Sequence, residues 1–265
     1  MKIHLKTTLW AVLFLFASAP NLISAQDEDI SLKIVRANES YHEKDYQSAA
    51  KLFEELIEQG QNNGYLYYNL GNSYMRLGKT GHAILNYLRA KLLLPRDENL
   101  DANLRYAISQ TTDQLHPPQG GFLSGLLFWM KSINLNEHFQ LLIMINFLFW
   151  SASIGLLYYR KHQWLIVKRV TLGFLLLILF STGIKYYLQS EQRTGVILAN
   201  KVDIKSDKGI QDITLFQLHE GAIISANEEN EGWLRISLDE DKTGWVSKKS
   251  VGFLKSPLGF NQAQL

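Results

Sequence analysis

The sequence predicts a multidomain membrane protein with an all-α repeat region, a hairpin of two transmembrane helices and a small all-β barrel. Three observations predict this architecture. Small and aromatic residues recur at a spacing of 34 residues between Ala37 and Tyr87, two long apolar segments follow at 139–159 and 170–188, and short alternating segments occupy 194–256. The chain has 265 residues, which is enough for two or more domains.

The first 25 residues have the pattern of a secretory signal peptide. Lys2 and Lys6 precede an apolar run from Leu9 to Ala19, and the small residue Ala25 stands just before an acidic stretch. We expect cleavage near Ala25, because this apolar run is too short to span a membrane comfortably. An uncleaved anchor helix is the alternative.

The repeat region is predicted from its period. Ala37 and Gly71, and Ala49 and Ala83, are each 34 residues apart, which is the period of the tetratricopeptide repeat. We therefore expect an all-α tetratricopeptide repeat domain over 26–115. Its parts are a first repeat at 30–63, a second at 64–97 and a capping helix at 98–113, because a single helical hairpin cannot bury its apolar face alone.

Residue size explains the repeat pattern. Gly71 and Ala83 are small, so the two helices of one hairpin can approach closely. Tyr74 and Tyr87 are expected to fill the space between neighbouring hairpins, and Pro95 ends the second helix.

The first helix of each hairpin is expected to line a groove. The resemblance to tetratricopeptide modules implies that asparagines there hold a peptide backbone and that an arginine meets a carboxylate. Asparagine both donates and accepts hydrogen bonds, and arginine offers a planar fork of donors, so the chemistry fits this role. A solvated helix face is the alternative. The candidate groove residues are Asn38, Tyr41, Tyr68, Asn72, Arg76 and Tyr106.

Two apolar segments predict a transmembrane hairpin. Residues 139–159 carry no formal charge, and about 20 apolar residues suffice to cross a bilayer. Residues 170–188 form the second predicted helix, interrupted by Lys185, whose side chain we expect to extend to the headgroups. Before them, residues 116–138 read as a linker with an amphipathic interfacial helix at 121–133. A membrane-proximal piece of core is the alternative for that helix.

The charges of the connecting segment predict the orientation of the hairpin. Residues 160–169 are expected to form a loop, and they contain Arg160, Lys161, Lys168 and Arg169. Short basic loops stay on the cytoplasmic side. Both soluble regions are therefore expected on the periplasmic side of the inner membrane, in agreement with the signal peptide.

Residues 194–256 resemble bacterial SH3-like domains, and 257–265 form a tail. The resemblance is carried by three pairs in order, namely Glu220–Gly221, Gly232–Trp233 and Gly244–Trp245. Some relatives of these domains bind cell-wall peptide, so Trp233 and Trp245 are candidates for a stacking surface. Packing of one or both indoles in the barrel core, above all Trp245, is the alternative.

Composition and motifs argue against other classes of function. The net charge is +2 and cysteine is absent, so a basic nucleic-acid face and thiol chemistry are not expected. The sequence contains no serine-hydrolase elbow, P-loop or HExxH motif. The histidines, such as His42, His82, His138 and His219, lack ligand spacing and are expected at surfaces or interfaces. We expect no enzymatic activity, no cofactor and no metal site.

The order of these parts is distinctive. With LGNSYMRLGKTGHAILNYLRAKLLLP and LFQLHEGAIISANEENEGWLRISL in this order, the chain resembles the BatE family of the Bacteroides aerotolerance operon. The resemblance implies an accessory protein in the membrane, beside von Willebrand factor A-type membrane proteins and a MoxR-type ATPase, with a link to oxidative stress. We expect a non-enzymatic scaffold whose partners are proteins and the lipid bilayer. An envelope protein that binds peptidoglycan is the alternative.

Overall fold

The computed structural model describes residues 25–115, 129, 132–191, 193–208, 213–238 and 242–254, without the side chains of 25–28 and 189–191. Three expected features lie outside the described residues: the signal peptide up to residue 24, most of the linker with its interfacial helix, and the C-terminal tail.

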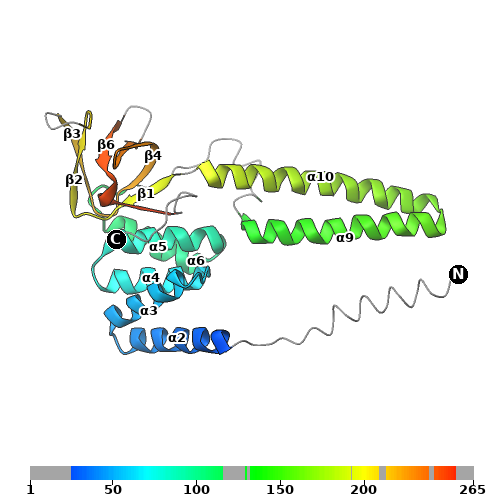
Figure 1. The fold of residues 1–265 in the computed structure, drawn as a ribbon, viewed down its shortest axis with the longest axis horizontal. Helices are drawn as coiled ribbons and strands as arrows, with labels where there is room; N and C mark the ends of the chain where they lie inside the picture. Colours follow the sequence, from blue (N-terminus) through cyan, green and yellow to red (C-terminus); the bar gives the residue numbers. More distant parts are fainter. Residues whose placement is uncertain are drawn as a thin grey trace.

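Within 25–115, the structure has a stack of helices in which each packs on the next along the chain (Figure 1). Side chains of Asp45, Asn63 and Asp97 cap three of them by accepting hydrogen bonds from backbone N–H groups. The helices form two hairpins and a closing helix. The second hairpin lies within the predicted limits 64–97, the first begins at Ala25, before the predicted position 30, and the closing helix ends at Ser109, before the predicted position 113. The helices are α2 (Ala25–His42), α3 (Tyr46–Glu58), α4 (Gly64–Arg76), α5 (Thr80–Leu93) and α6 (Glu98–Ser109).

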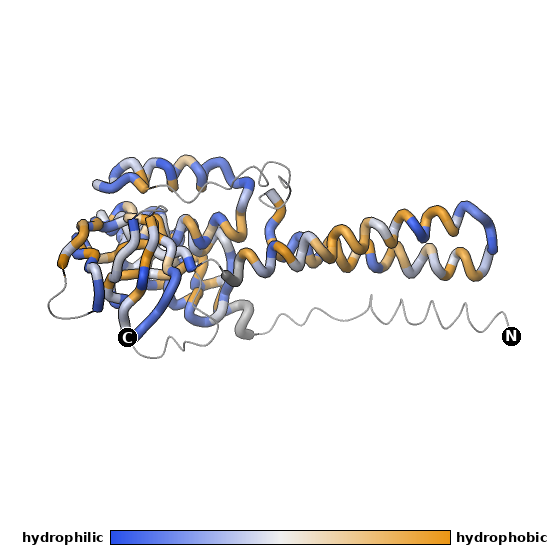
Figure 2. The backbone as a smooth tube through the Cα atoms, turned by 90° about the horizontal axis from the view of Figure 1, so that it is seen from above, coloured by the Kyte–Doolittle hydropathy of each residue, from blue (hydrophilic) through white to orange (hydrophobic). Residues whose placement is uncertain are grey.

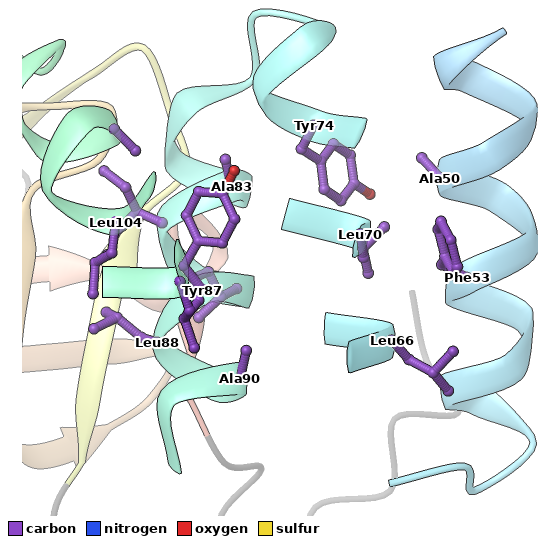
Figure 3. Close-up of a cluster of buried hydrophobic side chains, with 14 of the residues drawn as sticks. Ala50, Phe53, Leu66, Leu70, Tyr74, Ala83, Tyr87, Leu88, Ala90 and Leu104 are labelled. Carbon is purple, nitrogen blue, oxygen red and sulfur yellow. The ribbon is translucent and has the colours of Figure 1, made fainter. Parts of the chain in front are cut away.

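The core of the stack is built from facing side chains of α3, α4, α5 and α6 (Figure 3). Gly71 marks a close approach of α4 and α5, because a Cβ atom there would lie 2.6 Å from the ring of Tyr87. The ring of Tyr87 thus packs against α4 of its own hairpin, and Tyr87 also lines a cavity together with Tyr41 of the neighbouring hairpin. Tyr74 reaches the neighbouring hairpin, where its hydroxyl hydrogen-bonds to Glu54 of α3.

Two long helices extend away from this stack as an antiparallel hairpin (Figure 1). They are α9 (Leu135–Tyr159) and α10 (His162–Glu191), and within the described chain both are long and apolar enough to cross a membrane. Figure 2 shows the apolar residues along both helices and polar residues at their connection.

The predicted loop at 160–169 is too long, because only Arg160 and Lys161 lie outside the two helices. Trp164 explains the early start of α10: its ring stacks on Tyr159 and lies against Gly155 of α9. The side chain of Lys185 is buried and donates a hydrogen bond to the backbone carbonyl of Ile133, just before α9.

The C-terminal part is an antiparallel sheet with the strand order β3-β2-β6-β5-β4-β1-β7. Alternating apolar residues of these strands, such as Ile204, Ile224 and Val246, form a second buried cluster. The strands are β1 (Thr194–Ile197), β2 (Lys201–Lys205), β3 (Thr214–His219), β4 (Ile223–Asn230), β5 (Trp233–Ser237), β6 (Thr243–Ser247) and β7 (Val251–Phe253).

The sheet packs on α5, although we expected the helical and β regions to be separate domains. Val196 and Ile223 of the sheet belong to the same buried cluster as the helical core. The guanidinium of Arg89 on α5 donates to the carbonyl oxygens of Phe253, at 2.8 Å, and Leu254, at 3.2 Å. The helical stack and the sheet therefore form one body beside the hairpin.

Candidate functional site

The helical stack contains a cavity of about 580 Å³ between α2, α4, α5 and α6. We call it the tyrosine cavity, because four tyrosines contribute to its wall. Its volume lies within the range of about 300–1,000 Å³ that is usual for ligand pockets. It is lined by Tyr41, Tyr68, Asn72, Met75, Arg76, Tyr87, Asn103 and Tyr106.

A hydrogen-bond network fixes the polar wall of this cavity. The side-chain oxygen of Asn72 accepts from the hydroxyl of Tyr87, at 2.8 Å, and from Nδ2 of Asn103, at 3.0 Å. Nδ2 of Asn103 also donates to the hydroxyl of Tyr68, at 2.9 Å. Both bonds to Asn72 use its oxygen, so its Nδ2 group is left to donate to a ligand carbonyl.

Arg76 is the charged residue among those that line the cavity. It lies in the last turn of α4, and hydrogen bonding to Tyr41 raises the pKa of its guanidinium above the ordinary value. Burial raises the pKa of Tyr87, so its hydroxyl stays neutral beside this cation. The cavity therefore offers one permanent positive charge within a wall of neutral donors and acceptors.

Most of the predicted groove residues meet in this cavity. Tyr41, Tyr68, Asn72, Arg76 and Tyr106 line it. Asn38 does not line it. Its side-chain oxygen instead accepts a hydrogen bond from Nδ2 of Asn69, at 3.2 Å, and so ties α2 to α4.

The prediction missed three lining residues, namely Met75, Tyr87 and Asn103. A signal for Asn103 was present in the sequence, because it precedes Tyr106 by three positions and residues at that spacing share a helix face. Tyr87 was missed because its ring fills the core while its hydroxyl reaches the cavity wall. The 34-residue period alone does not show that one side chain can both pack in the core and place its hydroxyl in a cavity wall.

The two predicted tryptophans of the sheet are both covered by lysines. Trp245 is only 9% exposed, and Nζ of Lys208 lies 4.7 Å from the centre of its ring. Trp233 is half-buried, and Nζ of Lys205 lies 5.3 Å from its ring centre. Cations over indole faces are favourable contacts and occupy the surface that a stacking ligand would need.

A smaller polar cavity of about 210 Å³ lies where the sheet meets the helical stack. Its wall includes Thr80, Thr111 and His219, and the backbone N–H of His219 donates to the carboxylate of Asp113, at 2.7 Å. Nδ1 of His219 lies 3.1 Å from the same carboxylate. These contacts hold β3 against the turn that follows α6.

The described residues contain no cluster of three or more His, Asp or Glu side chains that could hold a metal ion. His138 is not at the surface, because it is fully buried at the contact between α9 and α10. Its Nδ1 lies 2.9 Å from the carbonyl oxygen of Asn134, which satisfies one ring nitrogen inside the hairpin.

Comparison of the chain with protein-family models and with curated proteins found no match. The features of this chain that bear on its function are therefore the tyrosine cavity and its place beside an apolar hairpin.

Proposed function

We propose that this protein is a membrane-anchored, non-enzymatic scaffold that binds an extended segment of a partner protein in the tyrosine cavity. The observation that carries the proposal is the convergence of Tyr41, Tyr68, Asn72, Arg76 and Tyr106 on one cavity. These residues come from three helices of the stack, and their side chains combine apolar ring surface with donors, acceptors and one cation.

The chemistry of the cavity suits a polypeptide. An extended backbone presents carbonyl groups, and Nδ2 of Asn72 is placed to donate to one of them. Arg76 provides a fork for a carboxylate, from an acidic side chain or a chain terminus. The tyrosines supply rigid surface that loses little conformational entropy on binding.

We assign the helical hairpins to tetratricopeptide repeats and the sheet to the SH3-like class. Two features support the first assignment, namely the 34-residue spacing and a second hairpin whose helices both lie within 64–97. For the sheet, the Gly–Trp pairs fall at the start of β5 and inside β6, which supports an SH3-like arrangement.

In this proposal α9 and α10 span the inner membrane, and Arg160 and Lys161 connect them on the cytoplasmic side. The helical stack and the sheet then lie on the periplasmic side. The resemblance to the BatE family suggests von Willebrand factor A-type membrane proteins as partners, in a complex linked to a MoxR-type ATPase and to aerotolerance.

The test is capture of the partner from the native membrane. Tagged full-length protein is purified in mild detergent, and specifically bound proteins are identified by mass spectrometry. Arg76→Glu reverses the charge in the cavity and is expected to lose the partner. Arg105→Glu makes the same change at an exposed position of α6 and is expected to retain it.

Equal capture by both variants would contradict the proposal. Recovery of wall fragments in place of proteins would support the alternative, peptidoglycan binding. That ligand would depend on Trp233, because Trp245 is buried.

A further inference from the structure

A second cavity, of about 350 Å³, lies where the helical stack meets the start of α9. We call it the junction cavity. It faces the outer end of the proposed transmembrane hairpin, and its wall changes from polar to apolar along α9. It is lined by Arg96, Ile133, Glu137, Gln140, Leu141 and Met144.

Arg96 forms the polar end and is held in place without being covered. Its guanidinium donates to the backbone carbonyl of Ser132, at 2.8 Å, and forms an ion pair with Glu137. The side chain is still 59% exposed. A guanidinium has five N–H groups, and the described residues provide partners for two of them. The others are available to an anionic ligand.

The charge around Arg96 is positive. Glu137 is engaged on both oxygens, because its second oxygen accepts from the backbone N–H of Asn134, at 2.8 Å, in a capping box. Lys185 also interacts with this carboxylate through its charge and donates to Ile133 of the cavity wall. Two cations thus surround one carboxylate, which favours an anion at the entrance.

Gln140 has a polar side chain, although it lies in the apolar segment of α9, where a membrane-spanning helix usually has apolar residues. It is exposed on α9, and the described part of the chain gives its amide no hydrogen-bond partner. Polar groups that face hydrocarbon without a partner are costly. A ligand that brings phosphate or ester oxygens to this level would satisfy the amide.

The expected depths of these residues in the membrane correspond to the headgroup and acyl-chain regions of a phospholipid. The hydrocarbon core needs about 20 helical residues. Counting back from Tyr159, where α9 ends, places the outer boundary near Gln140. Arg96 and Glu137 then lie at headgroup level, and Leu141 and Met144 lie beside the acyl chains. Met144 and its neighbour Ile143 are 52% and 70% exposed, so the apolar end continues into the lipid-facing surface.

We propose that the junction cavity binds one anionic phospholipid, with its phosphate at Arg96, its glycerol esters at Gln140 and an acyl chain along Leu141 and Met144. The proposal rests on the membrane anchoring in the proposed function and does not depend on the ligand of the tyrosine cavity. Bound lipid would fix the angle between the helical stack and the membrane, because Arg96 belongs to the turn after α5 and Gln140 to α9.

The test uses the full chain in nanodiscs that contain equal amounts of phosphatidylglycerol and phosphatidylcholine. Native mass spectrometry after release from the nanodisc counts the lipids retained. The wild type is expected to retain one phosphatidylglycerol. Arg96→Gln is expected to lower that retained fraction about tenfold, because a charge-assisted hydrogen bond is lost. Lys161→Gln, at the opposite end of the hairpin, is the matched control and is expected to match the wild type.

Gln140→Leu provides a second, independent variant. It makes α9 more apolar, so insertion is preserved, and it is also expected to lower retention. Release of all lipid by the wild type, equal retention of both lipids, or wild-type retention by Arg96→Gln would overturn the site. A chain that does not enter nanodiscs would overturn the membrane anchoring and the lipid site together. Failure of the wild type to capture a partner protein, with the lipid still retained, would overturn only the tyrosine-cavity function.

Discussion

The carboxylate of Glu220 accepts a hydrogen bond from the backbone N–H of Gly81, at 2.8 Å, across 139 residues of sequence. Gly81 lies in the first turn of α5, whose N-cap residue Lys79 makes no side-chain capping bond. The turn after β3 thus caps a helix of the repeat stack. An acidic group at this end also interacts favourably with the helix dipole. This contact joins the sheet to the stack at a defined point.

Glu220→Ala is expected to loosen the start of α5. Loss of an N-terminal cap typically costs about 0.5–2 kcal/mol of stability. We expect faster hydrogen exchange of the amides of Gly81 and its neighbours in the detergent-solubilised full chain. Glu228→Ala is the control, because Glu228 lies in the same sheet and makes only an exposed ion pair at 4.0 Å. Unchanged exchange at α5 in Glu220→Ala would show that the cap contributes nothing.

Acid is expected to lower the stability of the folded chain through His82, which follows Gly81 in α5. Burial, and then the charge of Lys79, lowers the pKa of His82 below its ordinary value of about 6.5. The unfolded chain therefore binds a proton more readily than the folded chain. The stability contribution of neutral His82 is complete above about pH 6.5, and it decreases as the pH falls from there towards the lowered folded-state pKa.

His82→Phe removes the titrating group while keeping a ring at this half-buried position. It also removes Nδ1, which is buried and has no hydrogen-bond partner in the described part of the chain. We expect the unfolding temperature of the variant to decrease less than that of the wild type between pH 7 and pH 5. His82→Gln, which is polar but does not titrate in this range, should show the same reduced pH dependence. A wild-type pH response in both variants would exclude His82 as its source.

The hairpins and strands could be predicted from sequence because their signals are local. Gly71, Ala83 and Tyr87 indicate where the two helices of one repeat pack closely. Alternation of apolar and polar residues indicates each strand. The contact between stack and sheet could not be predicted in this way. It depends on hydrogen bonds from Arg89 to the backbone carbonyls of Phe253 and Leu254. Every residue has a backbone carbonyl, so the sequence does not indicate which of them accept these bonds.

Gly71→Ala is expected to destabilise the helical stack. The added methyl group would lie 2.6 Å from two ring carbons of Tyr87 and 3.3 Å from the carbonyl oxygen of Ala83. Overpacking of this kind costs about 1–3 kcal/mol. A shift of Tyr87 would also break its bond to Asn72. The thermal unfolding midpoint of the full chain should decrease.

Gly173→Ala is the matched control for this change. Gly173 also lies within a helix, but apart from its chain neighbours and the nearby backbone of its own helix, no atom of the described residues lies within 4 Å of the position where its Cβ would be. Alanine is favoured over glycine in such an open helical position. An equal decrease in both variants would mean that the crowding at Tyr87 is not the cause.

The candidate site shows the same limit of sequence reasoning. Helical register placed Asn72, Arg76 and Tyr106 on one surface, and the structure brings them into one cavity. Register did not reveal that Asn72 lines the cavity whereas Asn38 does not. Asn72 accepts two hydrogen bonds in the cavity wall, whereas Asn38 bonds to Asn69 away from it.

Asn72 and Arg76 both line the cavity, but we expect their substitution to affect different properties. Asn72→Ala removes the acceptor of Tyr87 and one of the two acceptors of Asn103, and each hydrogen bond lost typically costs about 0.5–1.5 kcal/mol. It should lower the unfolding midpoint. Arg76→Glu alters an exposed side chain, whose substitution usually changes stability by no more than about 0.5 kcal/mol. It should leave the midpoint nearly unchanged while abolishing partner capture. Arg76→Glu is therefore the informative variant for binding, and loss of stability in it would show that Arg76 supports the fold and that its effect on capture is indirect.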